Sequence, residues 1–270
     1  MDIQNKIILE LISLSFEINK KKLINNISLK IEEKDMVSII GPNGSGKSTL
    51  IRLISNEISP SSGEVFFQNK LNSAWDPIDL ALSRSVLSQS SHLSFPFSVL
   101  DIVKMGRYPS KRDNLGINDD DICKYVLNIF DLSDYINRNY ITLSGGEKQR
   151  VQLARVVVQI WSENKYKNKL LILDEPTSYL DINHQSMLFE FLKDMNKKGL
   201  TIIMVLHDLN HAMINSSKIV MLKNANLIAY GKVDEVINNQ NLKKVFDIDL
   251  ALINNKELNK PLITFKKQGG

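Results

Sequence analysis

The chain has 270 residues, of which 43% are hydrophobic, enough for one large packed domain or two small ones. Its net charge of +4 suits anionic ligands or a membrane surface but is too small to indicate a nucleic-acid-binding protein. The single cysteine, Cys123, excludes an internal disulfide, and no apolar run approaches the roughly 18–20 residues of a membrane-spanning helix. We therefore expect a globular protein without a signal peptide or a transmembrane segment.

The first part of the chain predicts an antiparallel ribbon followed by a strand, a loop and a helix. Alternating apolar residues indicate strands over 7–16 and 27–31, on either side of the basic turn at 19–22. A buried strand over 36–41 then leads into a glycine-rich loop, and an apolar stripe indicates a helix over 48–58. The turn residues that follow end this unit.

The stretch from Ser98 to about Arg138 has a purely helical pattern, and we expect a helical subdomain inserted into an α/β core. Three consecutive aspartates, Asp119 to Asp121, lie within it. They could form a metal cluster, but acidic residues also favour the first turn of a helix, and we interpret them as a helix start.

Beyond Gly146, predicted helices and strands alternate. A helix runs to Trp161, strands are expected over 170–173 and 201–206, and the helix between them, over 182–198, ends at a glycine. This order predicts a parallel sheet with right-handed crossovers, and hence an α/β fold. From residue 218 onward we expect a pair of strands, a polar helix and a weakly patterned tail.

The segment GPNGSGKST has the spacing of a phosphate-binding loop. Its backbone N–H groups can surround phosphates, Lys47 can reach the outer phosphates, and the Ser48 hydroxyl can bind Mg²⁺. The residues expected to hold a nucleotide are Gly41, Pro42, Asn43, Gly44, Ser45, Gly46, Lys47, Ser48 and Thr49. This motif alone indicates only a nucleotide hydrolase with a P-loop.

A second motif, LSGGEKQR at 143–150, places Ser144, Gly145 and Gly146 at the start of a helix. Bare backbone donors and the dipole of a helix N-terminus favour anions, so the motif predicts a second phosphate-binding surface. One nucleotide does not need two such surfaces from one chain.

Carboxylates follow the apolar strand that ends near residue 173. Asp174 could share one Mg²⁺ with Ser48, and Glu175 could orient or deprotonate an attacking water, a contribution of about 10²–10⁴ in rate. The alternative is that both carboxylates cap the helix at 182. His207 closes the strand over 201–206, where it could reach a γ-phosphate or hold the glutamate, although a lone histidine is often structural.

These motifs, together with LLILDEPTSYLD at 170–181, resemble those of the ATP-binding subunits of ABC (ATP-binding cassette) transporters, in which two chains share two nucleotides. The resemblance implies one ABC domain over 1–270 with a P-loop α/β core. Its parts are a core with an antiparallel β subdomain over 1–88 and 139–240, an inserted helical subdomain over 89–138, and a C-terminal tail over 241–270.

The resemblance also assigns roles. Glu175 becomes the catalytic glutamate, His207 the switch histidine and Gln89 the glutamine that contacts Mg²⁺ and water, with an ordinary hinge residue as the alternative for Gln89. The magnesium ligands would be Ser48, Gln89 and Asp174.

Nucleotide contacts from elsewhere are implied too. Ser144, Gly145, Gly146 and Glu147 would reach the nucleotide of a partner chain, so a monomer should be nearly inert. Phe16 is the candidate platform for the adenine ring, although it could equally be a core residue. His92, His184 and His211 are expected to be surface or structural residues.

Within the family, the missing membrane spans exclude a fused exporter, and soluble members usually carry two cassettes in one chain. We expect a peripheral ATPase on the cytoplasmic face of the cell (inner) membrane, a homodimer docked on a permease dimer and served indirectly by a substrate-binding protein, with no nucleic acid. Phe95, Pro96 and Phe97 form either a packed turn or a permease contact.

The segment 89–109 resembles importers of iron-siderophores, cobalamin and haem, and Trp161 with the polar insert after it is similar to haem-import subunits. We therefore expect ATP hydrolysis that powers haem uptake. The same role in ferric-siderophore or cobalamin import remains an alternative, as does a soluble ABC ATPase that acts on nucleic acid. Tyr179 departs from the family, because many relatives have alanine there.

Overall fold

The computed structural model describes residues 6–89, 95–112, 119–162, 166–255 and 260–265. The chain forms two compact units, one of Met1–Ser73 with Ile203–Gly270 and one of Ala74–Ile202. Strand β8 (Thr201–Val205) begins in the second unit and continues in the first. Because the second unit is an insertion in the sequence of the first, the predicted site residues divide between them.

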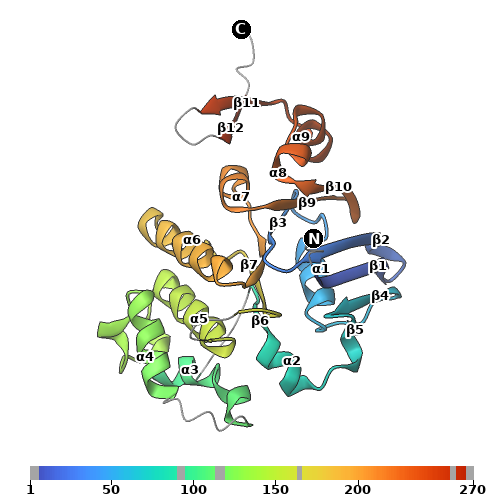
Figure 1. Ribbon diagram of the computed structural model, residues 1–270. Helices are drawn as coiled ribbons and strands as arrows, with labels where there is room; N and C mark the ends of the chain where they lie inside the picture. The colour runs from blue at the N-terminus through green and yellow to red at the C-terminus, as the bar shows by residue number, and fades with distance from the viewer. Residues whose placement is uncertain (1–5, 90–94, 113–118, 163–165, 256–259, 266–270) are drawn as a thin grey trace, which may run out of the picture. The chain divides into compact units, whose positions relative to one another are not determined.

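The first unit contains a four-stranded antiparallel sheet in the order β2-β1-β4-β5 (Figure 1). Its strands are β1 (Ile7–Ile18), β2 (Lys21–Glu32), β4 (Ser62–Phe67) and β5 (Lys70–Leu71). The first two are longer than predicted, since Asn19 and Lys20, with φ of 51° and 63°, form a two-residue turn whose twist matches the strands. The basic residues that follow Lys20 therefore belong to β2.

The strand that follows β2 in the sequence is β3 (Met36–Ile40). It pairs in parallel with β9 (Lys218–Lys223), and β9 in turn pairs with β10 (Asn226–Lys232). All five residues of β3 are buried, and all but Ser38 are apolar, as expected for a strand in a covered sheet. Helix α1 (Lys47–Ile54) follows the glycine-rich loop. It ends four residues before the predicted boundary, and Asn56 just beyond it has φ of 60°.

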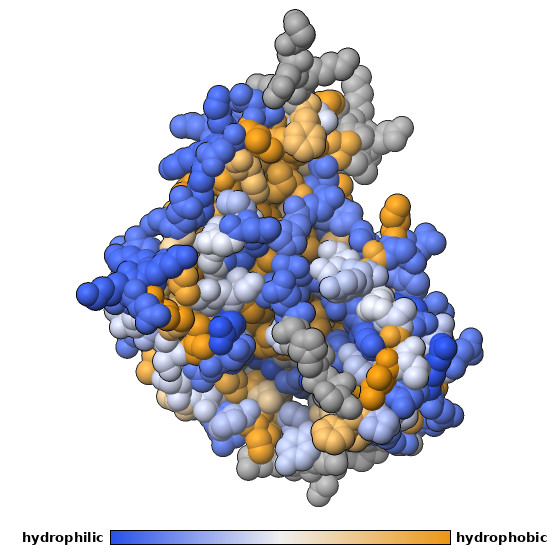
Figure 2. Space-filling view, turned by 180° about the vertical axis from the view of Figure 1, so that it is seen from behind, coloured by the Kyte–Doolittle hydropathy of each residue, from blue (hydrophilic) through white to orange (hydrophobic). Residues whose placement is uncertain are grey.

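The rest of the first unit comprises α7 (Leu209–Asn215), α8 (Val233–Val236), α9 (Asn239–Phe246) and a hairpin of β11 (Leu250–Asn255) and β12 (Lys260–Phe265). The sequence did not predict this hairpin. It is joined to α7 by Asn210, whose side chain donates to Ile263 O (3.2 Å) and accepts from Ile263 N (2.7 Å). Phe265 is 77% exposed, and Figure 2 shows hydrophobic surface in this C-terminal part of the chain.

The second unit contains α2 (Pro77–Ser83), the parallel strands β6 (Arg84–Leu87) and β7 (Leu170–Asp174), and α6 (Ile182–Lys197). Three further helices pack together, namely α3 (Val99–Met105), α4 (Asp119–Ile129) and α5 (Gly145–Gln159) (Figure 1). Gly106, just after α3, lets the chain approach α5 closely, because a Cβ there would lie 2.2 Å from Arg155 O on α5. Short 3₁₀ turns at Tyr108–Arg112 and Ser133–Tyr135 interrupt the predicted helical stretch, and a third, at Tyr140–Thr142, follows it.

The three aspartates form the first turn of α4, which confirms the predicted helix start. Asp119 pairs with Arg107 (2.8 Å) and Asp120 with Lys104 (2.8 Å). Among the described residues, no group of three or more acidic, histidine or cysteine side chains could by itself hold a metal ion. None of the helices in the described ranges is long and apolar enough to cross a bilayer.

Candidate functional site

The glycine-rich loop between β3 and α1 requires glycine at specific positions. Gly41, Gly44 and Gly46 have φ of 154°, 75° and 108°, values that side chains rarely allow. A Cβ at Gly41 would lie 2.2 Å from Leu222 O, and one at Gly46 would lie 2.6 Å from Leu23 O. At Gly44 no atom lies within 4 Å of such a Cβ, so this part of the loop is open on its outer side.

Lys47 begins α1 and is buried, with 6% of its surface exposed. Its Nζ donates to Gly41 O (2.8 Å) and Pro42 O (3.1 Å), so the ammonium lies over the loop. The cap of α1 is Gly46, which has no side chain to satisfy the first backbone N–H groups of the helix. A buried cation and uncapped N–H groups at a helix start fit the phosphate groups of a nucleotide.

His207 and Phe16 lie in the same unit as the phosphate loop. Leu206, just after β8, donates its N–H to Ile39 O (3.3 Å) near the end of β3, so the exposed His207 stands at the edge of the sheet from which the loop leaves. Phe16 is half-buried in β1 opposite Ile24, whose side chain would meet a Cβ on Gly46 at 3.0 Å. The adenine platform at Phe16 stays a prediction.

In the second unit, the chain leaves β7 at Asp174, which is 4% exposed, and turns sharply at Glu175, which has φ of 53°. Gln89 Nε2 donates to Glu175 Oε1 (3.2 Å), and Ser178 Oγ donates to Glu175 Oε2 (3.4 Å). The structure therefore brings together Gln89, Asp174 and Glu175, three residues that the sequence singled out.

These side chains line a cavity of about 290 Å³. Its lining residues are Gln89, Gln149, Asp174, Glu175, Ser178 and Tyr179. The alternative that Asp174 and Glu175 cap the helix at 182 is wrong, because Asp181 is the cap of α6 and accepts a hydrogen bond from His184 N (2.9 Å).

Ser144 caps α5. Its N–H donates to Glu147 Oε2 (2.7 Å), while Glu147 N donates to Ser144 Oγ (3.3 Å), a reciprocal capping box. The hydrogen bond from the Ser144 backbone is the main reason that the pKa of Glu147 lies below its usual value. Gly145 is exposed and Gly146 half-buried, and neither carries a side chain over the start of this 15-residue helix.

Three residues that line this cavity, Gln149, Ser178 and Tyr179, were not among the predicted site residues. Gln149 Nε2 donates to Glu175 O (3.4 Å) and Pro176 O (3.3 Å), and Ser178 contacts the Glu175 carboxylate. Gln149 lies inside the LSGGEKQR motif, but nothing in that motif indicates a contact with a residue 26 positions away. Only the fold brings α5 next to the loop after β7.

Two histidines outside the site lie among the described residues, at the starts of α6 and α7. His184 Nδ1 lies 2.9 Å from Asp181 Oδ1, and its Nε2 lies 3.6 Å from Asp131 Oδ2, an oxygen that is also 3.4 Å from Arg150. His211 donates its backbone N–H to the cap of α7, Asp208 (2.9 Å). His92 lies outside the described residues.

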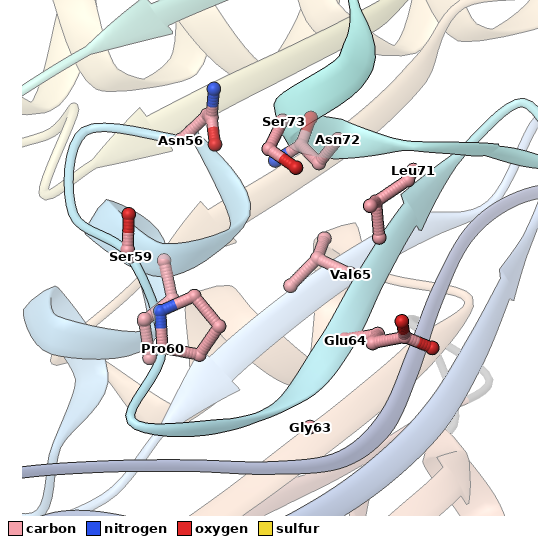
Figure 3. Close-up of a pocket in the computed structure, with 10 residues that line it drawn as sticks. Asn56, Ser59, Pro60, Gly63, Glu64, Val65, Leu71, Asn72 and Ser73 are labelled. Atoms are coloured by element: carbon pink, nitrogen blue, oxygen red, sulfur yellow. The ribbon is translucent and has the colours of Figure 1, made fainter.

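A further cavity of about 250 Å³ lies in the first unit, beside the end of α1 and strands β4 and β5 (Figure 3). Asn72 on its wall is buried, and its Nδ2 donates to Ile54 O (3.1 Å). None of the predicted site residues lines this cavity. We assign it no ligand.

Comparison with known proteins gives consistent matches. A family model described as ABC transporter matches residues 24–178. The hemin import ATP-binding protein HmuV of Escherichia coli O157:H7 is 38% identical over 93% of this chain and 96% of its own length. HmuV of Rhodopseudomonas palustris strain BisB5 is 41% identical over 88% of this chain and 90% of its own.

Solved structures agree on the fold. A transporter described as of the metal-chelate ABC type, in an inward-facing conformation, gives a TM-score of 0.77 at 24% identity, with 96% of this chain and 97% of the other covered. The ATP-binding cassette MJ0796, a dimer bound to ADP and Pi, gives 0.71 at 26% identity, with 83% and 98% covered.

Proposed function

This chain belongs to the ABC transporter family and is an ATPase of that family, and from that premise we propose that it powers the import of haem (hemin) through a partner permease. The observation that supports this cargo is its 38% and 41% identity, over most of its length, to proteins named for hemin import. The substrate would pass through the permease without touching this chain. The cargo therefore rests on relatedness, whereas the ATPase chemistry rests on the site.

Hydrolysis of a terminal phosphate needs charge neutralisation and an oriented water, because the transition state is loose and its charge is spread over oxygens. Lys47 and the backbone N–H groups of the phosphate loop would hold the phosphates. Ser48, Asp174 and Gln89 offer hydroxyl, carboxylate and amide oxygens, the donor set that Mg²⁺ prefers, and they would hold that ion. When bound, the ion would supply positive charge that offsets the negative charge developing on the transferred phosphate.

Glu175 would orient the attacking water or take its proton. Its carboxylate is held at Oε1 by Gln89 and at Oε2 by Ser178, so two hydrogen bonds set the direction of this side chain. His207 would contact the γ-phosphate from the end of β8. Fixed donors and acceptors of this kind lower the barrier because they need little reorganisation during the reaction.

The second phosphate-binding surface supports a homodimer. Ser144, Gly145, Gly146 and Glu147 would contact the nucleotide held by the partner chain, so each hydrolysis site would draw residues from both. The dimer would sit on a permease dimer at the cytoplasmic face of the inner membrane and be served indirectly by a substrate-binding protein. Phe95, 68% exposed and 6.1 Å between ring centroids from Phe97, is the candidate for contact with the permease.

Uptake experiments test the cargo. Cells that lack this chain should fail to grow with haem as the sole iron source, and the wild-type gene, but not the Glu175→Gln variant expressed at the same level, should restore growth. The ATPase activity of the purified complex should rise with a haem-loaded binding protein.

Other outcomes would redirect the proposal. Stimulation by a ferric-siderophore or cobalamin binding protein, with haem uptake unchanged in the deletion, would move the chain to that branch of importers and leave the ATPase site unchanged. Recovery with ribosomes or DNA, and not with a multi-span permease, would indicate a soluble ABC ATPase that acts on nucleic acid.

A further inference from the structure

The loop from Asp174 to Asp181 takes two sharp turns without any glycine. Glu175 and Tyr179 have φ of 53° and 66°, a left-handed conformation that is unfavourable for residues with a side chain. Such a conformation persists only where the surrounding structure holds it in place. The contacts of this loop should therefore include groups that keep Glu175 in its orientation.

Side-chain amides from two helices hold the loop. From α5, Gln149 Nε2 donates to Glu175 O (3.4 Å) and Pro176 O (3.3 Å). From α6, Gln185 Nε2 donates to Leu180 O (2.9 Å) and Thr177 O (3.4 Å). Gln149 thus binds the first turn, at Glu175, and Gln185 binds the second.

The start of α5 also touches the loop directly. A Cβ on Gly146 would lie 2.7 Å from Tyr179 O, and one on Gly145 would lie 3.4 Å from the Tyr179 ring. The two glycines therefore let the loop approach α5 closely at Tyr179, while Gln149, one turn further along the helix, reaches it at Glu175. A displacement of α5 would therefore move the loop both at Tyr179 and at Glu175.

We propose that Gln149 is a positioning residue for Glu175, which it orients by binding the carbonyl groups of residues 175 and 176. The hydrogen bonds to these carbonyls fix the orientation of the peptide plane next to Glu175. The direction in which the Glu175 side chain leaves the backbone is thereby fixed as well. A misplacement of about 1 Å at a reacting group can lower a rate about 100-fold.

The inference deepens the proposed function and rests on it. In the proposed dimer, Ser144 to Glu147 contact the partner's nucleotide, whereas Glu175 acts on the nucleotide of its own chain. Gln149 lies within one turn of α5 from the segment that would contact the partner's nucleotide, and it also contacts the loop that carries Glu175. Binding of one nucleotide at the start of α5 would thus orient the glutamate that serves the other.

The test uses the full-length chain with the permease that co-purifies with it. Gln149→Met keeps the length of the side chain but removes both N–H donors. Gln159→Met is the matched control, because Gln159 lies on the same helix and its Nε2 also bridges two backbone carbonyls, Ala81 O (2.9 Å) and Arg84 O (3.0 Å), away from Glu175. Turnover at saturating Mg-ATP, nucleotide Kd and thermal midpoint are measured for each.

We expect Gln149→Met to lower kcat about 10- to 100-fold with nucleotide Kd changed less than about 2-fold. Gln159→Met should lower the thermal midpoint but leave kcat near the wild-type value. In a Glu175→Gln background, Gln149→Met should cause no further loss of single-turnover rate, since the group that it positions is gone. Gln149→Asn keeps the amide but shortens its reach, and it should give an intermediate kcat. It replaces Gln149→Met in the test if the methionine variant does not fold.

Wild-type kcat in both Gln149 variants would overturn the inference. So would a loss of kcat that is fully additive with Glu175→Gln. A failure of the proposed function is distinguishable, because in that case the wild-type complex would not hydrolyse ATP or Glu175→Gln would hydrolyse it normally, whatever the Gln149 variants do.

Discussion

The phosphate loop of the first unit and the loop after β7 in the second unit reach unusual backbone conformations by different means. In the phosphate loop, glycines occupy the positions with positive φ at 41, 44 and 46. In the other loop, Glu175 and Tyr179 occupy them, and amides from Gln149 and Gln185 hold the chain. The first loop can thus adopt its conformation from its own sequence, whereas the second depends on its neighbours.

The difference matches the task that we propose for each loop. A phosphate cradle presents backbone N–H groups, so glycine is an advantage and side chains would obstruct the ligand. A residue that activates water must have a side chain, so the turn that presents Glu175 cannot use glycine and needs support from α5 and α6. Substitutions in the first loop should therefore mainly affect binding, and those in the second mainly the chemical step.

The Glu175→Gln variant should show the largest effect. We expect the single-turnover rate to fall about 10²- to 10⁴-fold, because the amide cannot accept the proton of the water, while ATP still binds. Gel filtration with Mg-ATP should then show a stable dimer. A variant that turns over normally, or that stays monomeric at saturating Mg-ATP, would contradict the role of Glu175 or the shared-site arrangement.

The Lys47→Ala variant tests the other loop. Loss of a buried, charge-assisted donor should weaken ATP binding about 10- to 100-fold, equivalent to roughly 1.5–3 kcal/mol. Isothermal titration measures this change. Lys30→Ala is the control, since it removes an exposed ion pair with Glu10 (2.9 Å) in the same unit and should leave ATP affinity unchanged. Equal effects of the two variants would argue against the phosphate-binding role of Lys47.

A mixed dimer tests whether the two regions meet across chains. Dimers that carry only Lys47→Ala, or only Ser144→Arg, should both fail to hydrolyse ATP. A dimer with one chain of each kind should regain one active site, because both defects fall in the same composite site and the other is intact. Dimers isolated through two different affinity tags, with single-turnover hydrolysis as the readout, check this. Inactive mixed dimers would contradict the composite site.

The same contrast explains what the sequence could predict. The phosphate loop, the end of β7 at Asp174 and the cap at Ser144 follow from short motifs whose residues act on their immediate neighbours. Gln149 and the C-terminal hairpin do not. Gln149 contacts Glu175 across 26 positions, and Asn210 binds Ile263 across 53, so neither contact leaves a local pattern in the sequence. The predicted strands over 7–16 and 27–31 were shorter than β1 and β2, because polar residues on both sides of the turn at Asn19 and Lys20 belong to the strands and not to the turn.

The smallest predicted effect concerns the capping box at the start of α5. The pKa of Glu147 is lowered in the folded protein, mainly by the hydrogen bond from Ser144 N–H. A carboxyl group with a lowered pKa stabilises the fold above its unfolded pKa, near 4.3, and loses that contribution as the pH falls through its folded pKa. Glu147→Gln should therefore cost about 0.5 kcal/mol at pH 7, and the deficit should disappear in acid.

Urea unfolding at several pH values between neutral and acid would measure this deficit. Glu190→Gln, at an exposed position of α6, is the control and should follow the wild-type pH dependence. A deficit for Glu147→Gln that stays constant as the pH falls would mean that its cause is lost packing and not the charged cap. Glu147 would then support α5 through its size, and the start of the second phosphate-binding surface would not depend on the charge that holds Ser144 in place.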